Sequence, residues 1–384
     1  MALRQPAAVP GLAQYPERLE DAAYHTEAGG FQRCIACESS PMQIEFIRQR
    51  LRALGAGPIH EQRLLRDWVR ARPHDQVRRR LDDFLPKTLR EALPALDAEL
   101  HGLARLLSSH PTEDGAARLL VGLSDGQTVE SVLLPRGGLC VSSQVGCAVG
   151  CQFCMTGRSG LIRQVTGGEI VAQVALARTQ RPVKKVVFMG MGEPAHNLSH
   201  VMEAIELLGI EGNIGHKNLV FSTVGDARVF ERLPQGVVKP ALALSLHTTK
   251  PDLRAQLLPR APRLTPGELV ALGEQYARLT HYPVQYQWTL LEGVNDGEDE
   301  MDGIVDLLKG KYAVLNMIPY NTIPDLQFKR PSWERARAIA GRLHQRGVLT
   351  KLRNSAGQEV DGGCGQLRAR AIAVQPRSIT IHPA

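Results

Sequence analysis

The decisive stretch of this sequence is CVSSQVGCAVGCQFC, residues 140–154. Within it Cys147, Cys151 and Cys154 follow the spacing C-x3-C-x2-C, and Phe153 directly precedes the last cysteine. Three thiolates this close together in one loop can hold three irons of a 4Fe–4S cluster. A structural zinc is the alternative, but zinc usually takes its four ligands as two close pairs. The spacing therefore favours a cluster in which one iron has no protein ligand.

An iron without a protein ligand can bind a substrate or a cofactor. Enzymes that cleave S-adenosylmethionine (SAM) by one electron use such an iron to chelate it, and the cofactor then supplies the radical chemistry. The loop accordingly predicts one 4Fe–4S cluster per chain, held by Cys147, Cys151 and Cys154, and SAM as its ligand.

Chain length, cysteine count and net charge indicate the broad class of the protein. A chain of 384 residues is long enough for a barrel-sized domain and an accessory domain. No apolar run approaches the ~20 residues of a membrane span, and the N-terminus has no apolar signal core. Seven cysteines, four of them in residues 140–154, indicate metal or redox use in a reducing cytoplasm. The net charge of +7 suggests a polyanionic partner.

The N-terminal third is predicted to be helical and basic. Apolar residues recur at three- and four-residue steps over 44–101, with breaks at 55–58 and 71–73. Residues 46–90 alone carry a net charge of +7 and include the run Arg78-Arg79-Arg80. A solvated helix face is one reading, and a phosphate-binding surface for RNA is the favoured one. Residues 1–110 are therefore predicted to form an accessory RNA-recognition domain.

Residues 111–384 predict an α/β domain. Residues 117–123 and 127–135 read as a hairpin, in which composition alone places Glu130 on the solvent face. Beyond the cysteine loop, near-continuous apolar strands alternate with helices, which is typical of a parallel sheet covered on both faces. With the strand that enters the loop, six strands predict a partial (βα)6 barrel: the other five lie at 185–190, 218–223, 241–246, 283–291 and 313–318, with helices at 168–177, 201–208, 266–279 and 332–346.

Polar residues follow the predicted strands at the edge where the chemistry of such barrels is found. Glu193, in a position suited to an ammonium group, follows a strand together with Gly192, and the glycine permits close backbone approach. The other candidates at this rim, taken singly, are ordinary strand-end residues, but they share one edge: Ser222, Ser245, Leu246, His247 and Asn321.

These motifs together resemble the RlmN/Cfr family of radical SAM RNA methyltransferases, and RlmN-like members most. The resemblance runs from about residue 120 to 370. Members of this family methylate a ring carbon of adenine in RNA: carbon 2 in large-subunit rRNA and some tRNAs, or carbon 8. The motifs that carry it are residues 140–154, Gly190-Met-Gly-Glu-Pro194, Ser222-Thr223, Ser245-Leu-His247, Val294-Asn-Asp-Gly297, Ile318-Pro-Tyr-Asn321 and Asp361-Gly-Gly-Cys-Gly-Gln-Leu367.

The resemblance implies roles for the remaining residues. Cys364 resembles the cysteine that carries a methyl group from a first SAM, and a second SAM activates that methyl for addition to the base. Cys140 resembles the thiol that attacks Cys364 and releases the product through a transient disulfide, so an external reductant such as flavodoxin or ferredoxin is expected. Glu130 resembles the proton acceptor. The rim residues resemble the SAM contacts: Gly192, Glu193, Ser222, Ser245, Leu246, His247 and Asn321. Gly362, Gly363 and Gly365 predict an open, mobile loop around Cys364.

The sequence departs from the family pattern in three places. The link between Pro135 and Cys140 is shorter than usual, the first hundred residues match only in being helical and basic, and the pair Cys34 and Cys37 is absent from the pattern and has no assigned role. Carbon 2 is favoured over carbon 8, and a monomer is expected. The alternatives are a radical SAM enzyme of the same fold that acts on a protein or small molecule, and a non-catalytic RNA-binding protein with a structural zinc.

Overall fold

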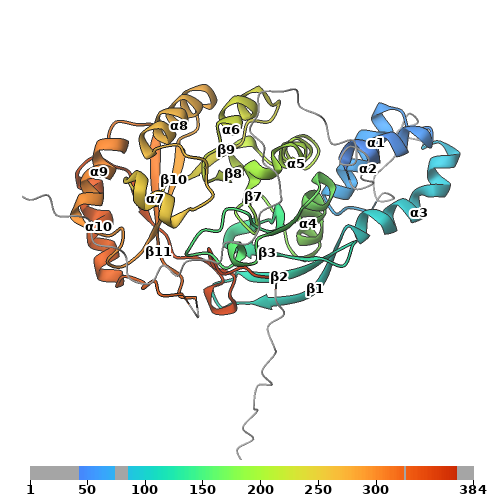
Figure 1. Cartoon of the computed structure of the whole chain (residues 1–384). Coiled ribbons are helices and arrows are strands. Elements are labelled where there is room, and N and C mark those ends of the chain that lie inside the picture. The colour runs from blue at the N-terminus through green and yellow to red at the C-terminus, as the bar shows by residue number, and fades with distance from the viewer. Residues whose placement is uncertain (1–42, 74–84, 324–325, 370–384) are drawn as a thin grey trace, which may run out of the picture.

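The computed structural model describes residues 43–73, 85–323 and 326–369. Two sequence features lie outside these residues: the pair Cys34 and Cys37, and the run Arg78–Arg80. The structure therefore does not test the predictions made on them. Figure 1 shows a strongly curved sheet with helices along its outer side and a small group of helices, α1 to α3, at one end of the molecule.

One mixed sheet organises the fold. Its order is β1-β2-β3-β4-β7-β8-β9-β10-β11-β12, with antiparallel pairing from β1 to β4 and parallel pairing from β4 to β12. The predicted α/β barrel is thereby confirmed. Its strands are β1 (Ala104–Pro111), β2 (Ala117–Leu123), β3 (Thr128–Leu134), β4 (Gly138–Cys140), β7 (Lys185–Phe188), β8 (Leu219–Thr223), β9 (Ala241–Ser245), β10 (Val284–Leu290), β11 (Ala313–Pro319) and β12 (Thr350–Leu352).

Helices follow the parallel strands and cover the outer side of the sheet (Figure 1). Two of them begin with capping boxes: the hydroxyl of Thr166 accepts from the Glu169 N–H, the Thr166 N–H donates to the Glu169 carboxylate, and Thr265 and Glu268 do the same. The helices are α4 (Gly167–Gln180), α5 (Leu198–Ile210), α6 (Ala227–Arg232), α7 (Pro251–Leu257), α8 (Pro266–Thr280), α9 (Glu298–Leu308) and α10 (Trp333–Gln345).

Three features of the strands were not predicted, and the first is β1, which extends the main sheet beyond β2. β12 adds a seventh strand to the parallel part, and a separate hairpin of β5 (Gln144–Gly146) and β6 (Leu161–Gln164) encloses the cysteine loop. The predicted boundary at residue 110 falls at the end of β1, which pairs with β2 in the main sheet. No helix of the described residues is both long and apolar enough to span a membrane.

The N-terminal helices are α1 (Ile44–Ala53), α2 (Pro58–Val69) and α3 (Lys87–Gly102). Their charge is more balanced than the sequence suggests, because acidic side chains pair with many of the arginines. Glu61 pairs with Arg48 and Arg52, and Glu211 of the barrel pairs with Arg66. Among the described residues of this segment, the density of arginine therefore overstates the free positive charge.

Candidate active site

The cysteine loop is held from three sides. The Cys147 N–H donates to the Gly160 carbonyl at 2.8 Å, across the β5–β6 hairpin. The Gln152 N–H donates to the Leu257 carbonyl at 3.0 Å, at the end of α7, and the Met155 N–H donates to the Gly365 carbonyl at 2.8 Å. Segments far apart in the sequence thus fix the loop at the carboxyl edge of the parallel strands.

The three thiols of the loop interact electrostatically with one another and with one carboxyl group. Burial is the largest cause that raises the pKa of Cys147 to about 12, and the charges of Glu193 and Cys154 contribute to this rise. Burial also raises the pKa of Cys151 well above its ordinary value, and Cys154, Cys147 and Glu193 add to the rise. The three cysteines and Glu193 therefore face a common region, as the sequence prediction requires.

The donor set suits a cluster better than a single ion. A single zinc ion takes four ligands that converge on one centre, with sulfurs at about 2.3 Å from it. A 4Fe–4S cube instead takes one thiolate on each of three separate irons. Cys147, Cys151 and Cys154 would hold those irons.

Gly192 and Glu193 lie in the loop that follows β7, at the carboxyl edge of the sheet. Gly192 has φ of +104°, and a Cβ there would lie 2.6 Å from Cβ of Gln144, so glycine is required. The Glu193 carboxylate accepts from the N–H groups of Ala195 at 3.0 Å and Val224 at 2.9 Å. Burial nevertheless raises the pKa of Glu193 to about 7. A cationic group such as an ammonium would stabilise its ionised form.

The ends of β8 and β9 bring Ser222, Ser245, Leu246 and His247 to the same edge. Ser222 and Ser245 are half-buried, and Leu246 is buried. His247 adopts φ of +62°, and its ring contacts that of Phe153 edge-on at 4.8 Å between centroids. Its Nδ1 accepts from the Thr289 N–H at 2.9 Å, and burial lowers its pKa to about 3. His247 is therefore a neutral imidazole that carries its proton on Nε2.

Asn321, after β11, joins this edge to the C-terminal segment. Its Nδ2 donates to the Cys364 carbonyl at 2.9 Å and to the Ser355 hydroxyl at 3.0 Å. Its Oδ1 is buried and has no hydrogen-bond partner among the described residues. A buried carbonyl without a donor is unfavourable, so this atom fits a bound ligand that carries an N–H or O–H group.

Cys364 interacts electrostatically with Cys154 of the cysteine loop and with Cys140. The protein atoms packed around Cys364 desolvate its thiolate and raise its pKa although the residue itself reaches solvent, and the negative charge of Cys154 adds to the rise. Burial likewise raises the pKa of Cys140, and the charge of Cys364 adds to that rise. The pKa values reach about 11 for Cys364 and about 12 for Cys140. Cys364 is exposed and Cys140 is buried, and each is a free thiol, as are the other described cysteines.

The segment around Cys364 is docked, contrary to the open loop that its glycines predicted. Gly362 and Gly363 are buried, and a Cβ on Gly363 would lie 2.5 Å from Oε1 of Gln366 and 2.9 Å from Nδ2 of Asn321. The glycines therefore permit close packing. Cys364 itself stays exposed within this docked segment.

The two thiols should differ sharply in alkylation. In metal-free protein the rate for Cys364 with iodoacetamide should rise about tenfold per pH unit to near pH 11, because the thiolate reacts and its pKa is raised. Cys140, which is buried, should stay unlabelled in the folded protein and serves as the internal control. Peptide mass spectrometry measures both rates. A plateau for Cys364 near pH 9, or faster labelling of Cys140, would contradict this assignment.

Glu130 is fully buried, so the solvent-face prediction from composition is wrong. Its Oε1 forms an ion pair with Arg118, which is also buried. Its Oε2 accepts from the Arg368 N–H at 2.7 Å, four residues after Cys364. The C-terminal segment covers this part of β3, and Glu130 connects the sheet to the segment that carries Cys364.

Removing one member of the Arg118–Glu130 pair should destabilise the fold strongly. Arg118→Met leaves a buried carboxylate without its counter-charge, and such changes cost about 3–5 kcal/mol in the free energy of unfolding. Urea unfolding measures the loss. The double variant Arg118→Met/Glu130→Gln is the control and should lose less than the sum of the two single variants. Additive losses would show that the two groups do not interact.

Several buried polar residues of the site were missed from the sequence. Ser142 donates to the Glu130 carbonyl at 2.5 Å and accepts from the Met191 N–H at 2.8 Å. Gln144 accepts from the Glu193 N–H at 2.7 Å, and Gln173 bonds both backbone groups of Ser142. Ser142 and Gln144 lie in the quoted spacer of the cysteine loop, which was the available signal. No local sequence pattern indicated that Arg254 and Arg118 would be buried near the site.

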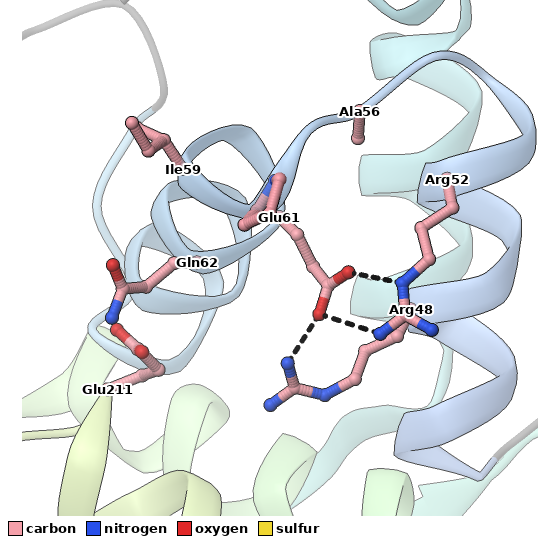
Figure 2. A pocket seen from close by; sticks show the side chains of 8 residues that line it. Arg48, Arg52, Ala56, Ile59, Glu61, Gln62 and Glu211 are labelled. Atoms are coloured by element: carbon pink, nitrogen blue, oxygen red, sulfur yellow. Dashed lines mark hydrogen bonds and ion pairs between the residues drawn. The ribbon is translucent and has the colours of Figure 1, made fainter.

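A separate pocket of about 490 Å³ lies between the N-terminal helices and the end of α5. Figure 2 shows Glu61 between Arg48 and Arg52, with Glu211 on the opposite side. Its arginines already have carboxylate partners, and none of the cysteines lines it. This pocket is not part of the cysteine site.

Comparisons with known proteins identify the class of enzyme to which the chain is similar. Residues 141–307 match the family model of the radical SAM superfamily. The chain is similar to the crystal structure of a radical SAM methyltransferase from Sphaerobacter thermophilus, with 34% identity, a TM-score of 0.74, and coverage of 85% of this chain and 98% of that one. The fold and the cysteine loop thus define a SAM-dependent radical methyltransferase.

Curated relatives narrow the assignment. The chain is 73% identical to proteins named "Probable RNA methyltransferase" from Leptothrix cholodnii, over 89% of this chain and 99% of the relative, and from Methylibium petroleiphilum, over 89% and 97%. This chain belongs to the family of these proteins. The predicted membership of the RlmN/Cfr family of radical SAM methyltransferases is confirmed.

Proposed function

We propose that this protein methylates a ring carbon of adenosine in RNA, carbon 2 in preference to carbon 8, through a methyl group carried on Cys364. The substrate class rests on the relatives named as RNA methyltransferases. The single observation that carries the mechanism is the docking of the Cys364 segment against the cysteine loop, where the Met155 N–H donates to the Gly365 carbonyl at 2.8 Å and Cys364 interacts electrostatically with both Cys154 and Cys140. rRNA and tRNA are the proposed substrates.

The bound cluster and SAM would supply the one-electron chemistry that activates the methyl group. Cys147, Cys151 and Cys154 would hold the cluster, and Gly192, Glu193, Ser222, Ser245, Leu246, His247 and Asn321 would contact SAM. The ionised Glu193 suits the ammonium of SAM, and the unpartnered Oδ1 of Asn321 suits one of its N–H or O–H donors.

Cys364 would accept a methyl group from a first SAM as a thiolate. Its raised pKa means that the thiol is protonated at neutral pH, so a proton must leave as the carbon–sulfur bond forms. Two SAM molecules are then used in each turnover, one as the methyl donor and one for activation.

Glu130 would take the proton from the ring carbon, and Cys140 would release the product. Both Glu130 oxygens have donors, so loss of the Arg368 contact on movement of the C-terminal segment would free Oε2. The Cys140 thiolate would then attack the sulfur of Cys364, forming a disulfide as the bond from that sulfur to the methylene carbon breaks. The methylene carbon keeps the electron pair of that bond and takes up a proton, which completes the methyl group of the product. Two electrons from a donor such as flavodoxin or ferredoxin would restore the thiols.

RNA recognition is assigned to residues 1–110, together with a cluster of arginines at the end of α2. Burial and the charges of Arg66 and Arg72 lower the pKa of Arg70, and Glu211, the partner of Arg66, offsets part of that effect. Burial, Arg70 and Arg72 lower the pKa of Arg178 of α4 in the same way. Mutually repelling cations are stabilised by a phosphate. A cytoplasmic monomer is proposed.

Mass spectrometry of digested RNA tests the function. Cells that lack the gene should lose one methyladenosine from rRNA or tRNA, and expression of the wild-type chain should restore it. Chromatography against 2-methyladenosine and 8-methyladenosine standards identifies the carbon. Unchanged RNA in the deletion strain, together with a modified protein or small molecule, would contradict the proposal.

A further inference from the structure

A buried arginine lies beside the cysteine site without a carboxylate partner. Arg254, in α7, is 4% exposed. Its Nη2 donates to the Val224 carbonyl and, at 3.1 Å, to the Ser245 carbonyl, at the ends of β8 and β9. Its Nε is buried and has no hydrogen-bond partner, and no carboxylate of the described chain lies within ion-pair distance of the guanidinium.

A buried guanidinium in this arrangement destabilises the fold unless an anion lies nearby. A buried guanidinium is normally paired with a charge, because its desolvation is not repaid by neutral carbonyl groups alone. The charged and titratable groups that interact with Arg254 are Cys151, Glu193 and His247. Neither Glu193 nor His247 is an ion-pair partner of Arg254, because the Glu193 carboxylate accepts from two backbone N–H groups and Nδ1 of His247 accepts from a third.

We propose that Arg254 compensates the negative charge of the cluster held by Cys147, Cys151 and Cys154, and so raises its reduction potential. The inference rests on the proposed function, since it requires the cluster. Three thiolates outweigh the two positive charges of an oxidised 4Fe–4S core, so the assembly is anionic and gains one more negative charge on reduction. A nearby buried cation stabilises the reduced state more than the oxidised state.

The charge of Arg254 is separable from its contacts. Arg254→Gln removes the charge and keeps a hydrogen-bond donor, whereas Arg254→Lys keeps the charge and loses the forked guanidinium. Arg260 provides a matched control, because this exposed arginine contacts the same cysteine loop through the Ala148 carbonyl at 3.1 Å. Arg260→Gln removes an equal charge from a solvated position, where screening weakens its effect.

Anaerobically reconstituted wild-type and variant proteins are titrated with dithionite and followed by electron paramagnetic resonance, before SAM is added. Arg254→Gln should have a lower reduction potential than the wild type, while Arg254→Lys and Arg260→Gln should stay close to it. Iron, sulfide and far-UV circular dichroism show that each protein is loaded and folded. Failure of the wild type to load a cluster would overturn the proposed function, which distinguishes that result from failure of this inference.

Other outcomes are equally decisive. Loss of the cluster in Arg254→Gln that Arg254→Lys restores, in folded proteins, supports the proposal, because the charge is then needed to retain the cluster. Loss in both variants overturns it, since the contacts to Val224 and Ser245 would be the cause. An unchanged potential in Arg254→Gln also overturns it, and weaker SAM binding in that variant would reassign Arg254 to SAM.

Discussion

Replacing Cys147, Cys151 or Cys154 singly by alanine should abolish the 4Fe–4S cluster. Each thiolate would hold a different iron, so none can substitute for another. Reconstituted wild-type protein should contain about four irons and four sulfides per chain, and each variant should fall close to zero. The expected absorption band at roughly 400 nm should disappear with them. Methyl transfer should be lost at the same time.

A control for this experiment comes from the other close cysteine pair. Cys34→Ala/Cys37→Ala also removes thiols, yet the pair stands apart from the cysteine loop in the sequence, and this variant should keep the full cluster. Full iron and sulfide in a triad variant would contradict the assignment. So would stoichiometric zinc without sulfide in the wild type, which would favour a structural zinc site.

The hydrophobic core of the barrel could be predicted because its strands are buried on both sides. The strands at 185–188, 219–223 and 241–245 each contain a run of at least three apolar residues, and the structure places each strand within two residues of the predicted bounds. β12 was missed because Thr350-Lys-Leu352 is too short to show a pattern. α9 was missed although Met301, Ile304, Val305 and Leu308 have helical spacing and are buried.

The candidate site shows where local patterns stop being informative. The spacing of Cys147, Cys151 and Cys154 is contained in eight residues, so the sequence alone predicts their common purpose. Glu130 was misplaced because its burial depends on Arg368, which is 238 residues away in the chain. A strand whose second face is covered by such a remote segment has no local sequence signal of that cover.

The same limit applies to Cys364 and Arg254. The resemblance to a family, and not spacing or composition, suggested the role of Cys364, and the structure places its segment against the cysteine loop through the bond from Met155 to Gly365. Arg254 lies in an unremarkable short helix of the sequence. Only the three-dimensional arrangement shows that its charge is buried beside Cys151 and Glu193.

Cys364→Ala should eliminate methylation while leaving the cluster in place. Cys364 is not one of the proposed iron ligands, so iron, sulfide and SAM binding should match the wild type. Product formation should fall by more than about 10³-fold, as removal of a covalent nucleophile does in other enzymes. Anaerobic assays with RNA and dithionite, read by mass spectrometry, measure this. Glu359→Ala, which changes an exposed residue of the same segment, is the matched control and should remain active.

Cys140→Ala should stop the reaction one step later. Without the second thiol the methylene bridge between Cys364 and the base has no nucleophile to resolve it, so a covalent protein–RNA adduct should accumulate to about one per chain. Denaturing electrophoresis with and without ribonuclease detects the adduct, and it should be absent from Cys364→Ala and from Cys140→Ala/Cys364→Ala. Continued turnover by Cys140→Ala, or an adduct that persists when Cys364 is removed, would exclude the two-thiol mechanism and leave the cluster assignment untouched.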